Sequence, residues 1–454
     1  MSAAITEYES FIQSKQVLDG VFGFTPTFMP STLKDFQAGL VDWAVRKGRA
    51  AIFADCGLGK TFMQLAWAEN VVRHTNKPVL VLTPLSVSAP TIREAEKFGI
   101  DARRSSDGVV VHGDNIVVTN YERLHYFDPS QFAGCVCDES SILKNLSGAT
   151  RREITEFMSG LPYRLLCTAT AAPNDYVELG TSSDALGYLK ATEMLARFFN
   201  HDGGETSKWR LKKHAEQHLF WRWVCSWARA VRKPSDIGFS DDGYDLPPLI
   251  CNEHIVSAAT VKDGLLFDMP ATTLEEQRDE RRRTITERCE LAAALACANK
   301  GPSVSWCHLN AEGDLLESMI PGAVQISGAD SDEFKEEMFD AFSQGQISKI
   351  ISKPVIAGFG LNWQHCAHQT FFPSHSFEQW YQAVRRCWRF GQEKPVVVDV
   401  IASDGERGVL ANMNRKSDQA SKMFTQLVAM MNNELQIEKN KGSHSNKEIM
   451  PSWL

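Results

Sequence analysis

The chain of 454 residues is long enough for two or three domains with cores of their own. Apolar residues make up 43% of it and no apolar stretch approaches membrane-spanning length, so we expect a soluble, cytoplasmic protein without a membrane partner. The net charge of −8 argues against coating nucleic acid through overall charge, although a local basic track stays open. The 11 cysteines form no Cys-x-x-Cys pair, and we expect reduced core thiols without zinc.

A glycine-rich loop is the clearest local motif. The apolar run 50–53 predicts a strand, 62–67 predicts a helix, and Ala-Asp-Cys-Gly-Leu-Gly-Lys-Thr at 54–61 lies between them. In such a loop backbone N–H groups surround a β-phosphate, Lys60 reaches the β and γ oxygens, and Thr61 can bind Mg²⁺. The candidate nucleotide-binding residues are Gly57, Gly59, Lys60 and Thr61.

An acidic pair follows one of the next strands. Short apolar runs that predict a mostly parallel sheet occupy 78–83, 115–119, 132–137 and 163–168. The third run leads directly into Asp138 and Glu139, at the carboxyl end where such sheets hold ligands. There Asp138 can hold Mg²⁺ and Glu139 can orient an attacking water.

A second α/β series begins with a probable helix near residue 284. Its predicted strands are 303–306, 323–326, 347–351, 369–372 and 396–401. Within it, Arg386 and Arg389 are three residues apart, so on one helix both guanidinium groups can address one target. If the target is a γ-phosphate held by the first domain, ATP would close a cleft between the domains.

A basic segment lies between the two series. Between Ser207 and Pro234 the sequence has eight basic residues and the single acid Glu216; the basic residues are Lys208, Arg210, Lys212, Lys213, Arg222, Arg229, Arg232 and Lys233. A helix over 220–231 would place Arg222, Arg229 and Lys233 on roughly one face. A phosphate-contacting surface and an ordinary solvated face both remain open. The four Trp of this segment favour the core over base stacking.

Together, the ordered motifs resemble superfamily 2 helicases, and most closely the Swi/Snf-like DNA translocases and their compact phage and prophage relatives. The resemblance extends from about Leu33 to about Ile401. It implies an α/β fold of two tandem RecA-like parallel-sheet lobes with an inter-lobe helical insertion. The expected divisions are an N-terminal extension (1–30), an ATP-binding first lobe (31–190), a basic, Trp-rich insertion (191–250), a second lobe (251–403) and a C-terminal helix with a polar tail (404–454).

The resemblance also assigns roles to residues. It implies that Gln37 contacts adenine, Gly360 approaches the nucleotide and Gln382 lies near the γ-phosphate, with Arg386 and Arg389 as the catalytic arginine pair. It places the coupling of hydrolysis to movement at Thr168, Ala169 and Thr170. Nucleic-acid backbone contacts are expected at Thr83, Pro84, Thr119, Asn120, Ser327, Gly328, Ser352 and Lys353. The C-terminal helix, with Leu427 and Met431, is expected to pack on the second lobe.

The activity implied by the resemblance is ATP hydrolysis with Mg²⁺, coupled to sequence-independent movement on DNA. Duplex DNA is favoured over single strands because no hairpin in the sequence predicts a wedge for strand separation. Three alternatives stay open: an ATP-regulated clamp that positions a partner such as a nuclease or a replication or recombination protein, a strand-separating DNA helicase, and an RNA helicase. If a phage or prophage encodes the chain, the location is the cytoplasm of a bacterial host.

Overall fold

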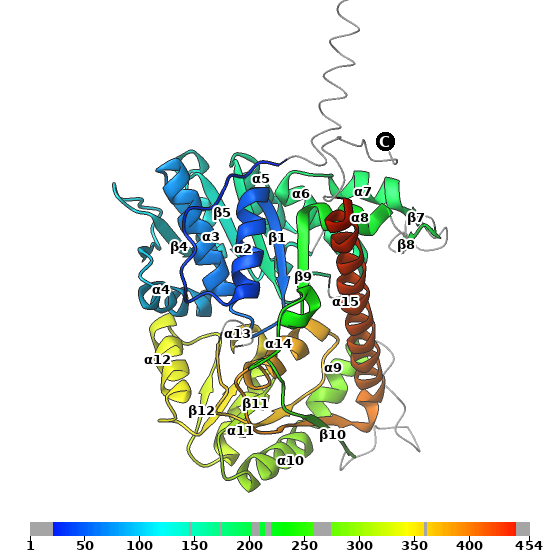
Figure 1. Ribbon diagram of the computed structural model, residues 1–454. Helices are drawn as coiled ribbons and strands as arrows, with labels where there is room; N and C mark the ends of the chain where they lie inside the picture. Colours follow the sequence, from blue (N-terminus) through cyan, green and yellow to red (C-terminus); the bar gives the residue numbers. More distant parts are fainter. Residues whose placement is uncertain are drawn as a thin grey trace, which may run out of the picture. The chain divides into compact units, whose positions relative to one another are not determined.

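The computed structural model describes residues 21–144, 148–172, 175–201, 209–213, 219–257, 274–357 and 361–441. The chain divides into two compact units, Met1–Asp241 with Ser421–Leu454, and Asp242–Ala420. Each unit is built on one parallel β-sheet with helices packed against it (Figure 1).

The first unit contains a seven-stranded sheet in the order β3-β4-β2-β5-β6-β1-β9, with all neighbours parallel. Its strands are β1 (Arg49–Ala54), β2 (Val79–Thr83), β3 (Ala102–Arg104), β4 (Ile116–Asn120), β5 (Gly134–Asp138), β6 (Tyr163–Thr168) and β9 (Ala228–Val231). Its helices include α2 (Asp35–Lys47), α3 (Lys60–Thr75), α4 (Ser88–Lys97), α5 (Ala149–Ser159), α6 (Leu179–Leu186), α7 (Ala191–Phe198) and α8 (Phe220–Trp227). A small antiparallel pair is formed by β7 (Phe199–His201) and β8 (Trp209–Leu211).

The second unit contains a six-stranded parallel sheet in the order β10-β15-β14-β11-β13-β12. Its strands are β10 (Leu249–Val256), β11 (Ser303–Trp306), β12 (Ala323–Ile326), β13 (Lys349–Ser352), β14 (His368–Phe371) and β15 (Val396–Ser403). Its helices are α9 (Leu274–Arg283), α10 (Ile285–Ala298), α11 (Asn310–Met319), α12 (Asp332–Ser343), α13 (Pro354–Ala357), α14 (Phe377–Cys387) and the start of α15 (Arg407–Lys441). Two parallel sheets with helices confirm the predicted fold class, two α/β lobes in tandem.

The basic segment folds differently from the prediction. The prediction of a single helix over 220–231 is wrong. Helix α8 ends at Trp227, and the chain continues as β9, which pairs with β1 in the first sheet. The sheet edge supplies hydrogen-bond partners that a longer helix would not use, so tertiary pairing overrides the helical pattern. Residues up to Asp241 therefore belong to the first unit, not to a separate insertion.

Arg229 is buried as a consequence. Its guanidinium donates to the carbonyl oxygens of Cys225 and Ala228 and lies 4.3 Å from the centroid of the Trp43 ring. Arg229 thus caps the end of α8 and does not lie on an exposed basic face. The placement of the tryptophans in the core is confirmed for Trp221, Trp223 and Trp227, which are buried, and the Trp227 ring packs edge-on against Phe53 of β1.

The C-terminal helix α15 also departs from the prediction. Leu410 and Met413 belong to the core of the second unit, whereas Leu427, Val428 and Met431 belong to the core of the first. The prediction that this helix packs on the second lobe is therefore wrong for its C-terminal part, which packs in the core of the first unit. The helix has 35 residues, and a polar stretch between the two apolar groups lets each group contribute to a different core.

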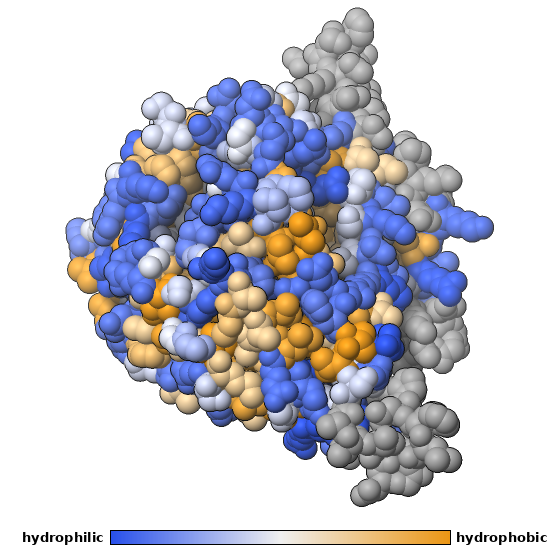
Figure 2. Space-filling view, turned by 90° about the horizontal axis from the view of Figure 1, so that it is seen from below, coloured by the Kyte–Doolittle hydropathy of each residue, from blue (hydrophilic) through white to orange (hydrophobic). Residues whose placement is uncertain are grey.

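Figure 2 shows hydrophobic side chains gathered across the middle of one face, with hydrophilic ones around them. Exposed large hydrophobic residues of the described chain, among them Val109, Ile250 and Val355, are a normal feature of a folded protein in water. In the part of the chain that the structure describes, no helix is long and apolar enough to cross a membrane.

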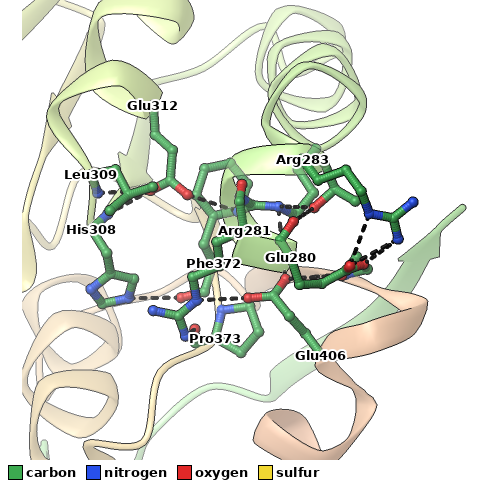
Figure 3. A network of polar contacts seen from close by, with 12 residues as sticks. Glu280, Arg281, Arg283, His308, Leu309, Glu312, Phe372, Pro373 and Glu406 are labelled. Atoms are coloured by element: carbon green, nitrogen blue, oxygen red, sulfur yellow. Dashed lines mark hydrogen bonds and ion pairs between the residues drawn. The ribbon is translucent and has the colours of Figure 1, made fainter. Parts of the chain in front are cut away.

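A buried ion-pair cluster holds the carboxyl ends of the second sheet (Figure 3). Arg288 is fully buried, with 2.8 Å between its Nη1 and Oε1 of Glu312, and 3.7 Å between its Nε and Oε2 of Glu406. Arg281 donates to Glu406 at 2.7 Å and to the carbonyl oxygen of Pro373 at 2.8 Å. Breaking one partner of such a cluster leaves an uncompensated buried charge, so these pairs tie α9, α10 and α11 to the sheet.

A second polar network joins four neighbouring strands of the same sheet. Asp399 on β15 is contacted by Asn252 at 3.0 Å and His254 at 2.8 Å from β10, and by His368 on β14 at 3.0 Å. The other ring nitrogen of His368 lies 2.8 Å from the hydroxyl of Ser303 on β11. Burial opposes ionisation of Asp399, but the hydrogen bonds from His254, Asn252 and His368 outweigh it, and its pKa lies below the usual value.

We predict that Asp399→Asn destabilises the second unit by about 2 to 4 kcal/mol at pH 7, because three donors, of which His368 is buried, lose a charged acceptor. A carboxylate with a depressed pKa in the folded state contributes stability above its unfolded pKa and loses it as the pH falls through the folded value. The deficit of the variant should therefore shrink below about pH 4. Urea unfolding followed by circular dichroism at pH 7 and below pH 4 measures both effects.

Asp314→Asn is the matched control, because it removes the same charge from an exposed position of the same unit. An equal loss in both variants at pH 7 would contradict a structural role for the network around Asp399.

Candidate nucleotide-binding site

The glycine-rich loop connects β1 to α3, as the sequence predicts. Gly57 and Gly59 have φ values of +89° and +77°, in the left-handed region that favours glycine. A Cβ atom added to Gly59 would lie 2.3 Å from Nε2 of Gln37. Both the backbone conformation and the close approach of Gln37 therefore require glycine at 59.

The loop presents unpaired donors at the start of α3. Within the described residues, the backbone N–H groups of Gly57, Gly59, Lys60 and Thr61 donate to no acceptor. The Lys60 ammonium lies across the loop and donates to the carbonyl oxygen of Ala54 at 2.9 Å. Orphan N–H groups at a helix N-terminus, next to a lysine, match the donor set that a polyphosphate requires.

Gln37 braces this loop from α2. Its Nε2 donates to the carbonyl oxygen of Leu58 at 2.8 Å, and its Oε1 accepts from the Lys34 N–H at 2.9 Å. The side chain is 6% exposed. The adenine contact of Gln37 stays a prediction, and the structure adds a support role for the phosphate loop that the sequence did not indicate.

Asp138 is the last residue of β5 and faces α3. Nε2 of Gln64 donates to its Oδ1 at 2.6 Å. Burial, and next the neighbouring charge of Glu139, raise the pKa of Asp138 to about 6, against the lowering effects of Gln64 and Lys60. A bound cation would favour the ionised form. Gln64 is not among the residues predicted from the sequence, although it lies one helical turn after Lys60 and so faces the same way.

Glu139 has an unusual backbone conformation. Its φ of +53° lies in the left-handed region, which is uncommon for a residue other than glycine. Its side chain is buried, and the hydroxyl of Thr168 lies 3.3 Å from its Oε2. The Thr170 N–H in turn donates to the Thr168 hydroxyl at 3.0 Å. The structure therefore places two of the predicted coupling residues, Thr168 and Thr170, next to the predicted catalytic carboxylate; the third, Ala169, is buried between them.

The residues of the first unit that are predicted to contact nucleic acid have side chains that point into the protein. Thr83 and Asn120 end the neighbouring strands β2 and β4 and pair in register. Both contact Ser88 on α4: the hydroxyls of Thr83 and Ser88 are 2.8 Å apart, and Ser88 donates to Oδ1 of Asn120. Thr119 is also buried. Pro84, which follows Thr83, is half-buried, and the nucleic-acid contacts of these residues stay a prediction.

The arginine pair of the second unit converges on one backbone atom. Nη1 of Arg386 and Nη1 of Arg389 each donate to the carbonyl oxygen of Leu361 at 3.1 Å. Arg386 also donates to Oε1 of Gln382 at 2.8 Å. The prediction that both arginines lie on one helix is wrong, because α14 ends at Cys387, but their side chains still meet. Gly360, the residue before Leu361, lies outside the described residues.

The other contacts predicted in the second unit are close together. Ser327 directly follows β12, and Ser352 ends the neighbouring strand β13 opposite Ile326. Ser352 is buried, with its hydroxyl 3.0 Å from the carbonyl oxygen of Ile326, and the Lys353 ammonium donates to Oδ1 of Asn310. Gly328, whose carbonyl oxygen is 3.4 Å from Nζ of Lys335, completes this group at the carboxyl ends of two strands.

The three basic residues predicted as a contact face are separated by the fold. Arg222 lies on α8, Arg229 is buried on β9, and Lys233 forms an ion pair with Asp241 at 3.0 Å. They do not share one helical face. All 11 cysteines are free thiols, and among the described residues no group of three or more His, Cys, Asp or Glu side chains is arranged to hold a metal ion.

Comparison with known proteins gives two similarities. Over 188 residues the chain is 26% identical to the CHD3-type chromatin-remodeling factor CHR7 of Arabidopsis thaliana. The matched segment covers 35% of this chain and 15% of that protein. It is also similar to the structure of a Sulfolobus solfataricus SWI2/SNF2 ATPase core in complex with dsDNA, with a TM-score of 0.43 and 16% identity over 92% of this chain and 98% of that chain.

No protein-family model matches the sequence. The chain spans 15% of the length of the curated relative that it matches. The similarity to a chromatin-remodeling factor agrees with the Swi/Snf-like resemblance of the motifs.

Proposed function

We propose that the chain is a nucleic-acid-dependent ATPase of the Swi/Snf-like kind, which couples ATP hydrolysis to sequence-independent movement on DNA, with duplex preferred. The observation that carries the proposal is the arrangement in the first unit. The orphan N–H groups of the loop and Lys60 lie at the start of α3, and Asp138 is bonded to Gln64 on the same helix. Glu139, the residue after Asp138, supplies the second carboxylate.

In this proposal the loop N–H groups and Lys60 bind the β and γ phosphates of ATP. Thr61 and Asp138 would hold Mg²⁺, which supplies charge neutralisation at the phosphates when bound. Glu139 orients the attacking water and accepts a hydrogen bond from Thr168. Arg386 and Arg389 take part in the same reaction as positive charges for the transition state, as the resemblance implies.

The proposed contacts with DNA are to phosphates. Backbone groups at Thr83, Thr119 and Asn120, and the group formed by Ser327, Gly328, Ser352 and Lys353, are suited to phosphate oxygens because each lies at the carboxyl end of a strand. Such contacts carry no sequence information, and binding through them weakens steeply with salt. These features support movement along DNA irrespective of sequence.

We expect ATP hydrolysis to be stimulated by duplex DNA more than by single-stranded DNA or RNA, and less at high salt. Lys60→Ala should lower kcat by about 10²-fold or more, because it removes a positive group at the phosphates. Phosphate release by the purified chain, with each nucleic acid at two salt concentrations, measures both effects. Lys77→Ala, an exposed lysine just beyond the same helix, is the control.

The pattern of stimulation distinguishes the alternatives. Stimulation by single strands alone would favour an unwinding helicase, and by RNA alone an RNA helicase. Binding of DNA with ATP turnover but no displacement of a triplex-forming strand would favour the clamp. Hydrolysis that no nucleic acid changes would contradict the motor proposal.

Arg389→Ala should lower kcat by about 10³-fold, as expected when an arginine that stabilises phosphoryl transfer is lost. Arg389 is half-buried and its neighbour Arg386 keeps its own bond to Leu361, so the variant should fold with an unchanged melting temperature. Steady-state kinetics with saturating duplex DNA provide the measurement. Arg282→Ala is the control, because that arginine has 75% of its side chain exposed; equal kinetics in the two variants would remove Arg389 from the reaction.

A further inference from the structure

Tyr121 lies buried behind the acidic pair. It directly follows β4 and is 4% exposed. Its hydroxyl donates to the backbone carbonyl oxygen of Asp138. Burial, and next the nearby Cys137 and Asp138, raise the pKa of the Tyr121 hydroxyl well above the usual value, so the group stays a donor at neutral pH.

The carbonyl that accepts this hydrogen bond belongs to the peptide between Asp138 and Glu139. Rotation of that peptide plane changes ψ of Asp138 and φ of Glu139 together, and φ of Glu139 is +53°. A rotated peptide could bring Glu139 back to an ordinary negative φ. It would also turn the Asp138 carbonyl away from its donor in a buried place, which is costly. The Tyr121 hydroxyl therefore opposes relaxation of the unusual backbone.

The carboxylate of Glu139 is held from the other side. Thr168, the last residue of β6, donates to Oε2 of Glu139 at 3.3 Å. The direction of the Glu139 side chain depends on its backbone φ, so a relaxed peptide would move the carboxylate away from Thr168. Tyr121 fixes the backbone of Glu139, and Thr168 fixes its carboxylate.

We propose that Tyr121 is a positioning residue for ATP hydrolysis: its hydroxyl holds the Asp138–Glu139 peptide in the orientation that keeps the Glu139 carboxylate next to Thr168. The inference rests on the proposed ATPase function and adds a residue to it. Tyr121 also directly follows Asn120, whose side chain is bonded to Ser88. A backbone shift in the predicted DNA-contacting segment would therefore reach the catalytic carboxylate through the adjacent residue.

The competing explanation is that Tyr121 is an ordinary core residue, since most buried hydroxyl groups donate to some acceptor. The chain contains a comparable, half-buried case: the hydroxyl of Tyr188 donates at 2.8 Å to the backbone carbonyl oxygen of Arg49, at the start of β1. Arg49 is at the opposite end of its strand from the phosphate loop. Tyr121→Phe and Tyr188→Phe therefore remove the same kind of hydrogen bond near the site and away from it.

The test measures kcat and KM for ATP with saturating duplex DNA, together with the melting temperature and the affinity for a fluorescent ATP analogue. We expect Tyr121→Phe to lower kcat by about 10- to 100-fold, because a misplaced reacting group costs rate, with KM and analogue affinity near wild type. Tyr188→Phe should keep the wild-type kcat even if its melting temperature falls. Equal kcat values in both variants would overturn the inference.

A second variant keeps the test decisive if Tyr121→Phe does not fold. Replacement of Tyr121 by 4-aminophenylalanine keeps the shape and a weaker N–H donor at the same place. We expect a melting temperature near wild type and a kcat several-fold below it, above that of the Phe variant where that variant folds. A kcat lowered by about 10- to 100-fold despite the retained donor would overturn the inference, because keeping the hydrogen bond would then not keep the rate. Absence of hydrolysis in the wild-type chain is a different result, which contradicts the proposed function and not the role of Tyr121 alone.

Discussion

Helices and neighbouring strands cover each parallel sheet, and this burial decides where polar chemistry can take place. In β2, β4 and β5 every residue is buried, so side chains along these strands can only pack. The polar residues that end the strands are Thr83 on β2, Asn120 on β4, Asp138 on β5 and Thr168 on β6. These four residues therefore lie together at the carboxyl end of the sheet, next to the loop that follows β1.

Arg164, in the first unit, shows how a buried charged group away from the site is satisfied. Arg164 is buried and donates to the carbonyl oxygens of Ser159, Leu161 and Ala185, at the ends of α5 and α6. Desolvation, and next the charge of Arg49, lower the pKa of Arg164 to about 10, a cost that these three acceptors offset. The phosphate loop is the contrasting case: its N–H groups have no acceptor within the described residues, as expected where a ligand supplies one.

Backbone strain marks the same place. Among the described residues, Asn76 and Glu139 are the non-glycine residues with positive φ. Asn76 is the C-cap of α3, where asparagine commonly adopts this conformation. Glu139 has no such local reason, and its conformation is maintained by contacts from residues distant in sequence, Tyr121 and Thr168. Strain that its surroundings maintain is characteristic of functional positions.

The sequence by itself determined the α/β class, the strand–loop–helix unit around Lys60 and the acidic pair after β5. These depend on apolar periodicity and glycine positions, which are local properties of the chain. Only the tertiary structure decided that residues 228–231 form a strand, that Arg229 is buried and that α15 contributes to both cores. It also revealed Gln64 and Tyr121 beside the acidic pair. The physical reason is that these outcomes depend on which segments lie side by side, and a sheet edge or a buried carbonyl can outweigh the local preference of the residues that meet it.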